Sequence, residues 1–226
     1  MSTASEGPTD GVWCIVVAAG SGRRFGAPKQ FERIGDERVV DRSVRIAASV
    51  CDGVVLVLPS AAASEVVEHA TVTVAGGATR SESVRRGLDR VPPDAIVLVH
   101  DAARPLASPE LFERIIAAVR DGAAAAVPVV AVADTIRDVD GGVVDRDRLR
   151  AVQTPQGFDG AALRSAHAGA PEGTDDAGLV EAAGGRIELV EGEATNLKIT
   201  GPQDLAVATL LAELADGGPD AADSRR

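Results

Sequence analysis

The sequence VVAAGSGRRFGAPKQF, Val16 to Phe31, carries a glycine turn directly behind the apolar run Val12–Ala18. The run predicts a buried β-strand. Gly20 and Gly22 follow it, and backbone amides beside glycine can approach an anion without obstruction by a side chain. Three cations crowd the same short loop, where they would repel one another without a shared anion: Arg23, Arg24 and Lys29. The stretch therefore predicts a strand that leads into a binding loop for a polyanion such as a triphosphate.

Two well-known glycine loops do not fit this stretch. The dinucleotide pattern G-x-G-x-x-G needs a glycine at position 25, which is Phe25, and Gly26 comes one place late. The acidic residue expected about 20 positions later is matched only loosely by Asp41, which opens a helical pattern. The Walker loop fails because Lys29 lacks a preceding glycine and is followed by Gln30. The loop therefore predicts phosphate binding of another kind.

Apolar, β-prone runs recur along the chain with helical patterns between them. The runs alternate little, as in strands buried on both faces: Val12–Ala18, Val54–Leu58, Thr71–Ala75, Ala95–Val99 and Ala125–Val130. The helical patterns cover Val39–Val50, Ser81–Val91 and Pro109–Arg120. This order predicts an α/β fold, a Rossmann-like three-layer sandwich with a mostly parallel sheet. Ligands of such sheets bind at the carboxyl ends of strands, so we expect the chemistry just after Ala18, Ala75, Val99 and Val130.

The alternation of strand and helix breaks after Val130. Two short β-prone pieces flank Asp140-Gly141-Gly142, which predicts a hairpin arm over about residues 132–152. An isolated hairpin is marginally stable, so we expect a homodimer in which the arm is covered by a second subunit. The chain then predicts two helical segments, a strand at Ile187–Val190 and a last helix at Pro202–Ala215. We expect one domain over residues 1–216 and a disordered tail over 217–226.

Composition narrows the classes of partner. The 226 residues include 23 Lys and Arg against 34 Asp and Glu, a net charge of −11, and 2% aromatic residues. Such a chain lacks the basic face and the stacking platforms of a nucleic-acid-binding protein. No apolar run approaches the roughly 20 residues of a membrane helix, and the N-terminus does not match a signal peptide. Cys14 and Cys51 fit no metal-binding spacing, so we expect buried thiols in a soluble cytoplasmic protein.

Blocks spread over nearly the whole chain carry a family resemblance. Besides AAGSGRRFGAPKQF they are AGGATRSESVRRGL, VLVHDAARP, VPVVAVADTIR, RAVQTPQGF, GTDDAGLVE and ATNLKITGPQDLA. The first block resembles the signature of nucleotidyltransferases that make activated sugars and polyols. Together, in this order, the blocks resemble the 2-C-methyl-D-erythritol 4-phosphate cytidylyltransferase family of the non-mevalonate isoprenoid pathway.

The resemblance implies a reaction and a set of reacting groups. A phosphate oxygen of the acceptor attacks the α-phosphorus of CTP and releases pyrophosphate, with Mg²⁺ as the cofactor. Cations match the family's catalytic positions: Arg24, Lys29, Lys198 and, reaching from the other subunit, Arg146. The spacing from Arg24 to Lys29 is about two residues shorter than in relatives, so Arg23 could substitute for Arg24. Many relatives carry an acid where this chain has Thr195, which leaves a second metal carboxylate in doubt.

The resemblance also implies binding positions for both substrates. The nucleotide positions are Ala18, Ala19, Gly20, Gly22, Gly76, Gly77, Arg80 and Ser83. The acceptor positions are Asp101, Arg104, Thr135, Thr154 and Thr174. The metal would be held by Asp101 or through the CTP phosphates alone. Thr79 or Ser81 can also cap a helix, a role compatible with binding, because helix N-termini bind anions.

Other polar residues have structural interpretations. We expect His100 to be structural, and His69 and His167 to lie on the surface. Asp175 and Asp176 suit the N-terminus of a helix better than a metal site.

Alternative functions remain open on sequence alone. A related transferase could use another polyol phosphate, such as ribitol 5-phosphate. An NADP-dependent oxidoreductase is disfavoured because the chain has no tyrosine and hence no Tyr-x-x-x-Lys pair. A non-catalytic nucleotide sensor would not need the four cations, since it has no transition state to stabilise.

Overall fold

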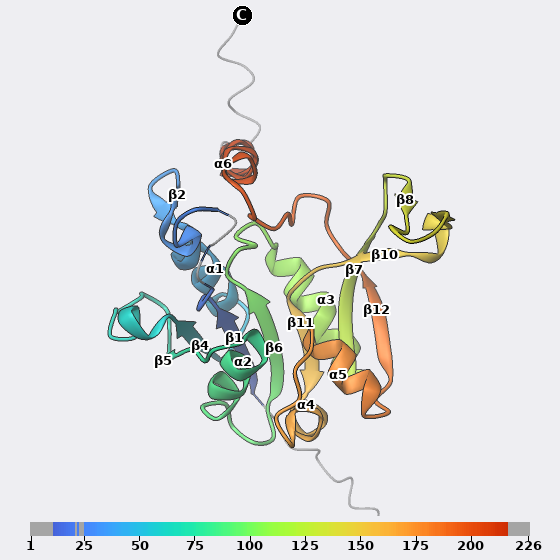
Figure 1. Cartoon of the computed structure of the whole chain (residues 1–226). Coiled ribbons are helices and arrows are strands. Elements are labelled where there is room, and N and C mark those ends of the chain that lie inside the picture. Colours follow the sequence, from blue (N-terminus) through green and yellow to red (C-terminus); the bar gives the residue numbers. More distant parts are fainter. Residues whose placement is uncertain (1–10, 21, 23–24, 217–226) are drawn as a thin grey trace, which may run out of the picture.

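The computed structural model describes residues 11–20, 22 and 25–216, and its core is one mixed sheet between two layers of helices (Figure 1). Parallel strands form most of the sheet: β1 (Val12–Val17), β4 (Gly53–Leu58), β5 (Val72–Ala75), β6 (Ile96–Asp101), β7 (Ala125–Ala131) and β12 (Ile187–Glu191). Two strands run antiparallel to their neighbours, β10 (Arg150–Val152) and β11 (Gln156–Asp159). The predicted α/β class with a mostly parallel sheet is confirmed.

The register shows how the antiparallel strands fit in. Strand β10 pairs with Val129–Ala131 of β7, and β11 pairs with Ala125 and Ala126 of the same strand. They therefore lie end to end along one edge of β7, where β11 alone also pairs with β6, while β12 takes the other edge of β7. The sequence patterns did not predict this return into the sheet, because β10 and β11 are short and rich in polar residues.

Helices cover both faces of the sheet, as the three-layer prediction requires. The first face packs against α1 (Val39–Ala48) and α3 (Pro109–Arg120), and the second against α2 (Arg80–Leu88), α4 (Gly160–His167) and α5 (Asp176–Ala182). Within β1, Cys14 and Val16 point to the first layer and Ile15 to the second, the alternation expected of a strand. Burial on both faces explains why the strands read as continuous apolar runs.

The remaining elements lie around the end of the sheet where β1 and β6 terminate. A short turn of helix, η1 (Lys29–Phe31), leads into the two-stranded ribbon β2 (Arg33–Ile34) and β3 (Glu37–Arg38). Helix α6 (Pro202–Asp216) packs beside this ribbon, and Ile34, Ile199, Ala208 and Ala212 share a small core there. A further turn, η2 (Ser60–Ala62), follows β4.

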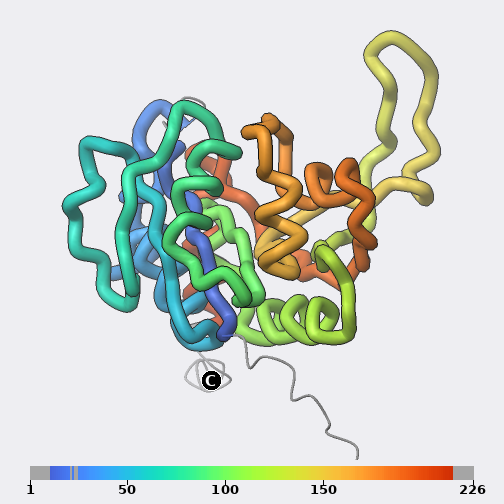
Figure 2. Tube along the Cα trace, turned by 90° about the horizontal axis from the view of Figure 1, so that it is seen from below, coloured from blue at the N-terminus to red at the C-terminus, as the bar shows by residue number. Residues whose placement is uncertain are grey.

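The predicted arm is present as a hairpin that stands away from the sheet (Figure 2). It contains β8 (Ile136–Arg137) paired with β9 (Val143–Val144), followed by the turn η3 (Arg146–Arg148). Val139 and Val143 on this arm are largely exposed, at 98% and 62%. The predicted tail lies outside the described residues. None of the described helices is long and apolar enough to cross a membrane.

Candidate active site

A cavity of about 680 Å³ opens at the carboxyl ends of the central strands. Its walls come from the loops after β1, β5 and β6 and from the segment before α6. The lining residues are Val17, Ala18, Ala19, Gly20, Gly22, Phe25, Lys29, Gln30, Gly77, Ala78, Thr79, Arg80, Ser83, Asp101, Ala102, Ala103, Lys198 and Thr200. Three of the four strand ends expected to carry chemistry therefore converge, whereas the fourth, after Val130, leads into the arm.

The glycine turn after β1 forms one wall of the cavity. Gly22 has a φ of +64°, and the amides of Phe25 and Gly26 donate to its carbonyl at 2.9 Å. A Cβ on Gly22 would lie 1.8 Å from the carbonyl oxygen of Ala27, so only glycine fits there. Buried Gln30 donates from Nε2 to the Gly20 carbonyl at 3.3 Å and ties the turn to η1. Of the predicted cations of this loop, Arg23 and Arg24 lie outside the described residues.

Replacing Gly22 by alanine should weaken binding of CTP, the nucleotide that the family resemblance implies, at least about tenfold. The new methyl group must push the loop backbone away from its anion-binding course. Isothermal titration calorimetry with CTP and Mg²⁺ measures the change. Gly26→Ala is the matched control, since Gly26 also has a positive φ, +88°, but a Cβ there meets no atom within 4 Å. Equal losses in the two variants would show that backbone conformation alone, and not this close approach, controls the loop.

The loop after β5 forms the opposite wall and presents the N-terminus of α2. Thr79 caps the helix, as predicted, by accepting from the Glu82 amide at 3.1 Å, and Glu82 accepts from the Ala78 amide at 2.7 Å. A Cβ on Gly76 would lie 2.3 Å from the Cβ of Ala19, so the glycine lets the two loops touch. Ser83 accepts from the Gly77 amide at 3.1 Å. The predicted nucleotide-binding glycines therefore lie at and around one cavity.

Charged side chains from three distant segments meet at the base of the cavity. The Asp101 carboxylate accepts from Lys198 Nζ at 2.5 Å and from Arg80 Nε at 3.4 Å. Arg80 also donates from Nη1 to Asp176 at 2.7 Å. Burial opposes ionisation of Asp101, but Arg80 and Lys198 overcome it and hold the pKa of Asp101 well below its usual range. Burial likewise disfavours the Arg80 cation, yet Asp176 and Asp101 raise the pKa of Arg80, so both groups stay charged.

The chain contains only two lysines, Lys29 and Lys198, and both line this cavity. Lys29 Nζ donates to the carbonyl of Ile199 at 2.5 Å, next to Lys198 in the sequence. All other cationic side chains apart from the histidines are arginines. The two compact ammonium groups, which suit phosphate oxygens as point charges, are thus both placed where the sequence predicted an anion.

Behind Asp101 lies a buried chain of polar groups. The Asp101 amide donates to Thr154 Oγ1 at 3.0 Å, and this hydroxyl lies 3.1 Å from His100 Nδ1. His100 Nε2 lies 3.1 Å from the Arg104 carbonyl, which can only accept. The ring therefore carries its proton on Nε2 and accepts from the threonine at Nδ1. Burial lowers the pKa of His100 to about 4, so the ring is neutral. This placement agrees with the expected structural role of His100.

The free energy of unfolding should fall by up to roughly 3 kcal/mol as the pH is lowered from 7 to 4, because burial moves the pKa of His100 from 6.5 to about 4. Between pH 4 and 6.5 the histidine is protonated in the unfolded chain but neutral in the folded chain. The free energy of unfolding therefore rises with pH across this window. Urea unfolding at several pH values measures the slope. His100→Gln should flatten it, whereas His69→Gln, at a half-exposed position, should not. A parent slope of zero would contradict the buried neutral ring.

Several residues predicted to bind the acceptor lie outside the cavity lining. Arg104 donates to the carbonyls of Asn196 at 2.7 Å and Val152 at 3.2 Å, and Thr154 is buried beneath Asp101. Thr135 and Thr174 are exposed. Their roles in binding remain predictions. The structure brings together Lys29, Lys198, Asp101, Arg80 and the glycine loops.

The surface position predicted for His167 is wrong. Its side chain is buried, and Nε2 lies 3.0 Å from Asp176, which is fully buried and also holds Arg80. Asp175 does cap α5, accepting from the Gly178 amide at 3.0 Å, but Asp176 turns inward. In the sequence, Asp176 stands directly after the capping residue Asp175. That position predicts the start of a helix, but it does not predict a buried ion pair.

Among the polar residues of the lining, Gln30 and Thr200 were not predicted. Gln30 supports the glycine turn, and Thr200 donates to Asp204 at the start of α6. Gln30 directly follows Lys29 in PKQF, and Thr200 comes two positions after Lys198 in NLKIT. This closeness to predicted cations is the one feature of the sequence that could have indicated them.

The described residues suit a metal ion that enters with its ligand. Among them, no three His, Cys, Asp or Glu side chains converge as a metal cage. Asp101 supplies one carboxylate at the cavity wall. Mg²⁺ is usually held by one or two carboxylates together with water and substrate phosphates, so this donor set fits Mg²⁺ bound to a triphosphate.

Comparison with known proteins agrees with the geometry. The sequence profile of the family "2-C-methyl-D-erythritol 4-phosphate cytidylyltransferase" matches residues 12–213. Enzymes of that name from Rhodococcus opacus and Saccharopolyspora erythraea are 44% and 45% identical, covering 89% and 87% of this chain and 95% and 97% of theirs. The crystal structure of the Thermus thermophilus enzyme, 40% identical, superposes with a TM-score of 0.79 and covers 91% of this chain and 100% of its own. The chain therefore belongs to the 2-C-methyl-D-erythritol 4-phosphate cytidylyltransferase family.

Proposed function

We propose that this chain transfers a cytidylyl group from CTP to 2-C-methyl-D-erythritol 4-phosphate and releases pyrophosphate, a step of isoprenoid precursor biosynthesis. One observation carries the proposal: Lys29 and Lys198, the only lysines of the chain, share a cavity with Asp101 and the glycine loops. Family membership supplies the identity of the two substrates.

The residues act by alignment and charge stabilisation. An oxygen of the acceptor phosphate attacks the α-phosphorus of CTP, and the bond from that phosphorus to the bridging oxygen of pyrophosphate breaks. Two anions must approach, so cations that hold their oxygens lower the barrier. Lys29 and Lys198 both line the cavity, which supports this role, and Arg24 would join them by family resemblance. Asp101 holds Lys198 and Arg80. By family resemblance it would also contact the hydroxyl groups of the polyol.

Mg²⁺ is the proposed cofactor, and other divalent cations could take its place. It would be held by triphosphate oxygens and water, and Asp101 is the carboxylate among the described lining residues. When bound, it neutralises charge on the phosphates. We further propose a cytoplasmic enzyme, in keeping with two free cysteines.

A coupled pyrophosphate assay tests the activity. Release should require CTP and 2-C-methyl-D-erythritol 4-phosphate together and should be much slower with ribitol 5-phosphate or with another nucleoside triphosphate. Faster release with ribitol 5-phosphate would assign a different acceptor. No release with any polyol phosphate, combined with NADPH binding, would favour the oxidoreductase alternative.

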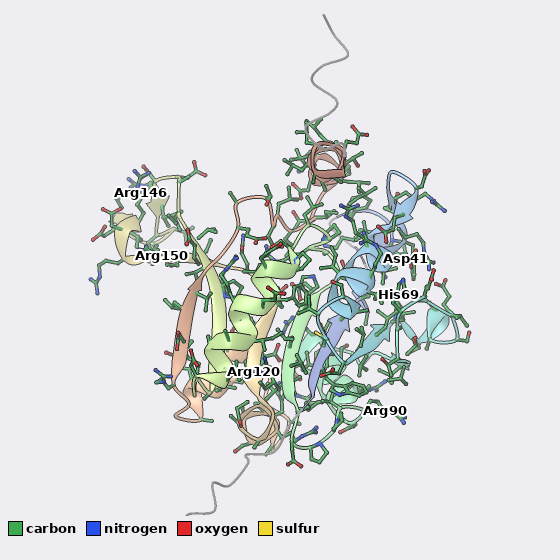
Figure 3. The ribbon with its side chains drawn as sticks, turned by 180° about the vertical axis from the view of Figure 1, so that it is seen from behind. Asp41, His69, Arg90, Arg120, Arg146 and Arg150 are labelled. Atoms are coloured by element: carbon green, nitrogen blue, oxygen red, sulfur yellow. The ribbon has the colours of Figure 1, made fainter. Side chains whose placement is uncertain are left out.

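We also propose a homodimer in which the arm of one subunit reaches the cavity of the other. Arg146 lies on the arm, apart from the sheet and from the cavity of its own chain (Figure 3). It donates to the carbonyl of Ala133 within the same arm, and its side chain is exposed. The exposed Val139 and Val143 give the arm an apolar surface for a partner.

Mixing two inactive variants should restore activity if Arg146 acts across the dimer. Arg146→Ala and Lys198→Ala should each lose most activity. After unfolding and refolding together in equal amounts, half of the dimers are mixed and each has one intact site. Activity should then return to about one quarter of the parent. Recovery within the sum of the two separate variants would place Arg146 in its own chain's site or outside any site.

A further inference from the structure

Lys198 belongs to a segment, residues 193–200, that crosses the end of the sheet without helix or strand. Beyond the lysine, the Ile199 amide donates to the Ala103 carbonyl at 2.8 Å, and the Ile199 carbonyl accepts from Lys29 at 2.5 Å. This irregular segment therefore carries Lys198 and also supplies the carbonyl to which Lys29 donates. Irregular backbone needs specific hydrogen bonds to keep a single course, so the contacts before Lys198 decide where its ammonium group lies.

Gln153 supplies several of those contacts, beside Arg104, which donates to the Asn196 carbonyl, and Ser108 and Arg114, which donate to the Glu193 carboxylate. Its side chain is 5% exposed and does not line the cavity. Nε2 donates to the Glu193 carbonyl at 2.7 Å and to the Asn196 carbonyl at 3.3 Å, while Oε1 accepts from the Glu193 amide at 3.0 Å. The primary amide thus pairs with both main-chain groups of Glu193, as a neighbouring strand would.

Asn196 completes the connection from the side of the segment. It is fully buried, and its Nδ2 donates to the Thr154 carbonyl at 2.9 Å and to Gln153 Oε1 at 3.4 Å. Two residues later comes Lys198, which pairs with Asp101. The same Thr154 accepts from the Asp101 amide at 3.0 Å. Residues 153–154 therefore hold both sides of the Asp101–Lys198 pair: Thr154 bonds to the Asp101 amide, and both residues bond to Asn196, two positions before Lys198.

We propose that Gln153 and Asn196 are positioning residues: two buried amides that clamp residues 193–196 to residues 153–154 and so present Lys198 to the reacting phosphates. The proposal rests on the proposed role of Lys198 as a phosphate-stabilising cation. Neither amide touches the cavity, so both act through the lysine. The Gln153 amide is costly to remove, because the Glu193 amide, which donates to Gln153 Oε1, then loses its acceptor.

A double-mutant cycle distinguishes positioning from general stability. Gln153→Met keeps the volume and removes the hydrogen bonds. It should lower kcat/KM about 10- to 100-fold in the parent, mainly through kcat, because a misplacement of about 1 Å can cost that much. In a Lys198→Ala background the same change should cost less than about twofold, since the group that it positions is gone. Equal losses in both backgrounds, or a loss below about twofold in the parent, would overturn the proposal.

Amide hydrogen exchange of the ligand-free protein gives a second readout that needs no activity. Gln153→Met should speed exchange at Glu193, Asn196 and Ile199 at least about tenfold, and unchanged rates there would overturn the clamp. Thr71→Val is the matched control, because it removes one hydrogen bond, from the Val54 amide, at the opposite end of the sheet. It should leave kcat and these three amides unchanged. Gln153→Asn, which retains a shortened amide, replaces Gln153→Met if the latter does not fold.

The two readouts separate this proposal from the proposed reaction. A parent that does not turn over CTP with 2-C-methyl-D-erythritol 4-phosphate would refute the transferase activity. The exchange rates of the three amides would still decide whether the clamp exists.

Discussion

Lys198→Ala should lower kcat about 100- to 1,000-fold, corresponding to about 2.7–4 kcal/mol of transition-state stabilisation, by analogy with the loss of one oxyanion-hole donor. The side chain contributes a positive charge beside Asp101 at the base of the cavity. Without it, charge developing on the α-phosphoryl oxygens loses a fixed partner, and Asp101 retains only Arg80. Steady-state kinetics with both substrates saturating measures the loss in kcat.

Arg186→Ala is the matched control for Lys198→Ala. It also removes one positive charge, from a side chain that is 64% exposed and pairs only loosely with Glu188 at 3.6 Å. The net charge of the protein changes equally in the two variants, so a field effect of overall charge would appear in both. Equal kcat values for the two variants would remove Lys198 from the reaction.

Lys29→Ala should produce a loss of similar size, about 100-fold or more in kcat, because its ammonium group lines the same cavity as that of Lys198. Its donation to the Ile199 carbonyl also ties the glycine loop to the segment that carries Lys198. Lys29→Arg should recover only part of the activity, since a planar guanidinium does not replace a compact ammonium group. Kinetics of the three proteins, parent, alanine and arginine, measures both effects.

Arg33→Ala controls for charge close to Lys29, because Arg33 is exposed and bonds to the Asp36 carbonyl outside the cavity. Its turnover should match that of the parent. If Lys29→Ala retained turnover within about tenfold of the parent, a loss below roughly 1.4 kcal/mol, the proposed mechanism would have to be abandoned.

The layered part of the fold was predictable because its signals are local. Helix α3 begins at Pro109 behind a Ser108 cap and ends at Arg120, and each of these features is written in consecutive residues. The buried strands are equally direct, since β4 is buried at every position and therefore apolar throughout. The predicted hairpin at Asp140-Gly141-Gly142 followed from turn chemistry.

The strands β10 and β11 were not predictable in the same way. Gln153, which follows β10, and Gln156, in β11, are buried although they are polar, because their amides find partners in segments far along the chain. Only the folded arrangement supplies those partners, so no local pattern marks such residues as interior. His167 was misplaced for the same reason: its burial depends on the buried carboxylate of Asp176, on the next helix.

The site shows a similar division. The glycines and Lys29 were predictable because they stand in loops that directly follow the apolar strands β1 and β5. The grouping of Lys198, Asp101 and Arg80 was implied only by family resemblance, since these residues come from three separate segments. The inward turn of Arg104 to backbone carbonyls is a tertiary contact, for which the sequence carries no signal.

The central claim is that the two lysines meet one bound nucleotide, and the composition allows a direct measurement. With ¹³C-labelled lysine, the Hε–Cε region of the NMR spectrum contains signals from Lys29 and Lys198 alone, because the chain has no other lysine. Titration with CTP and Mg²⁺ should shift both sets of signals along one binding curve, with a single Kd. Shifts confined to one lysine, or two curves with different Kd values, would contradict a shared triphosphate site.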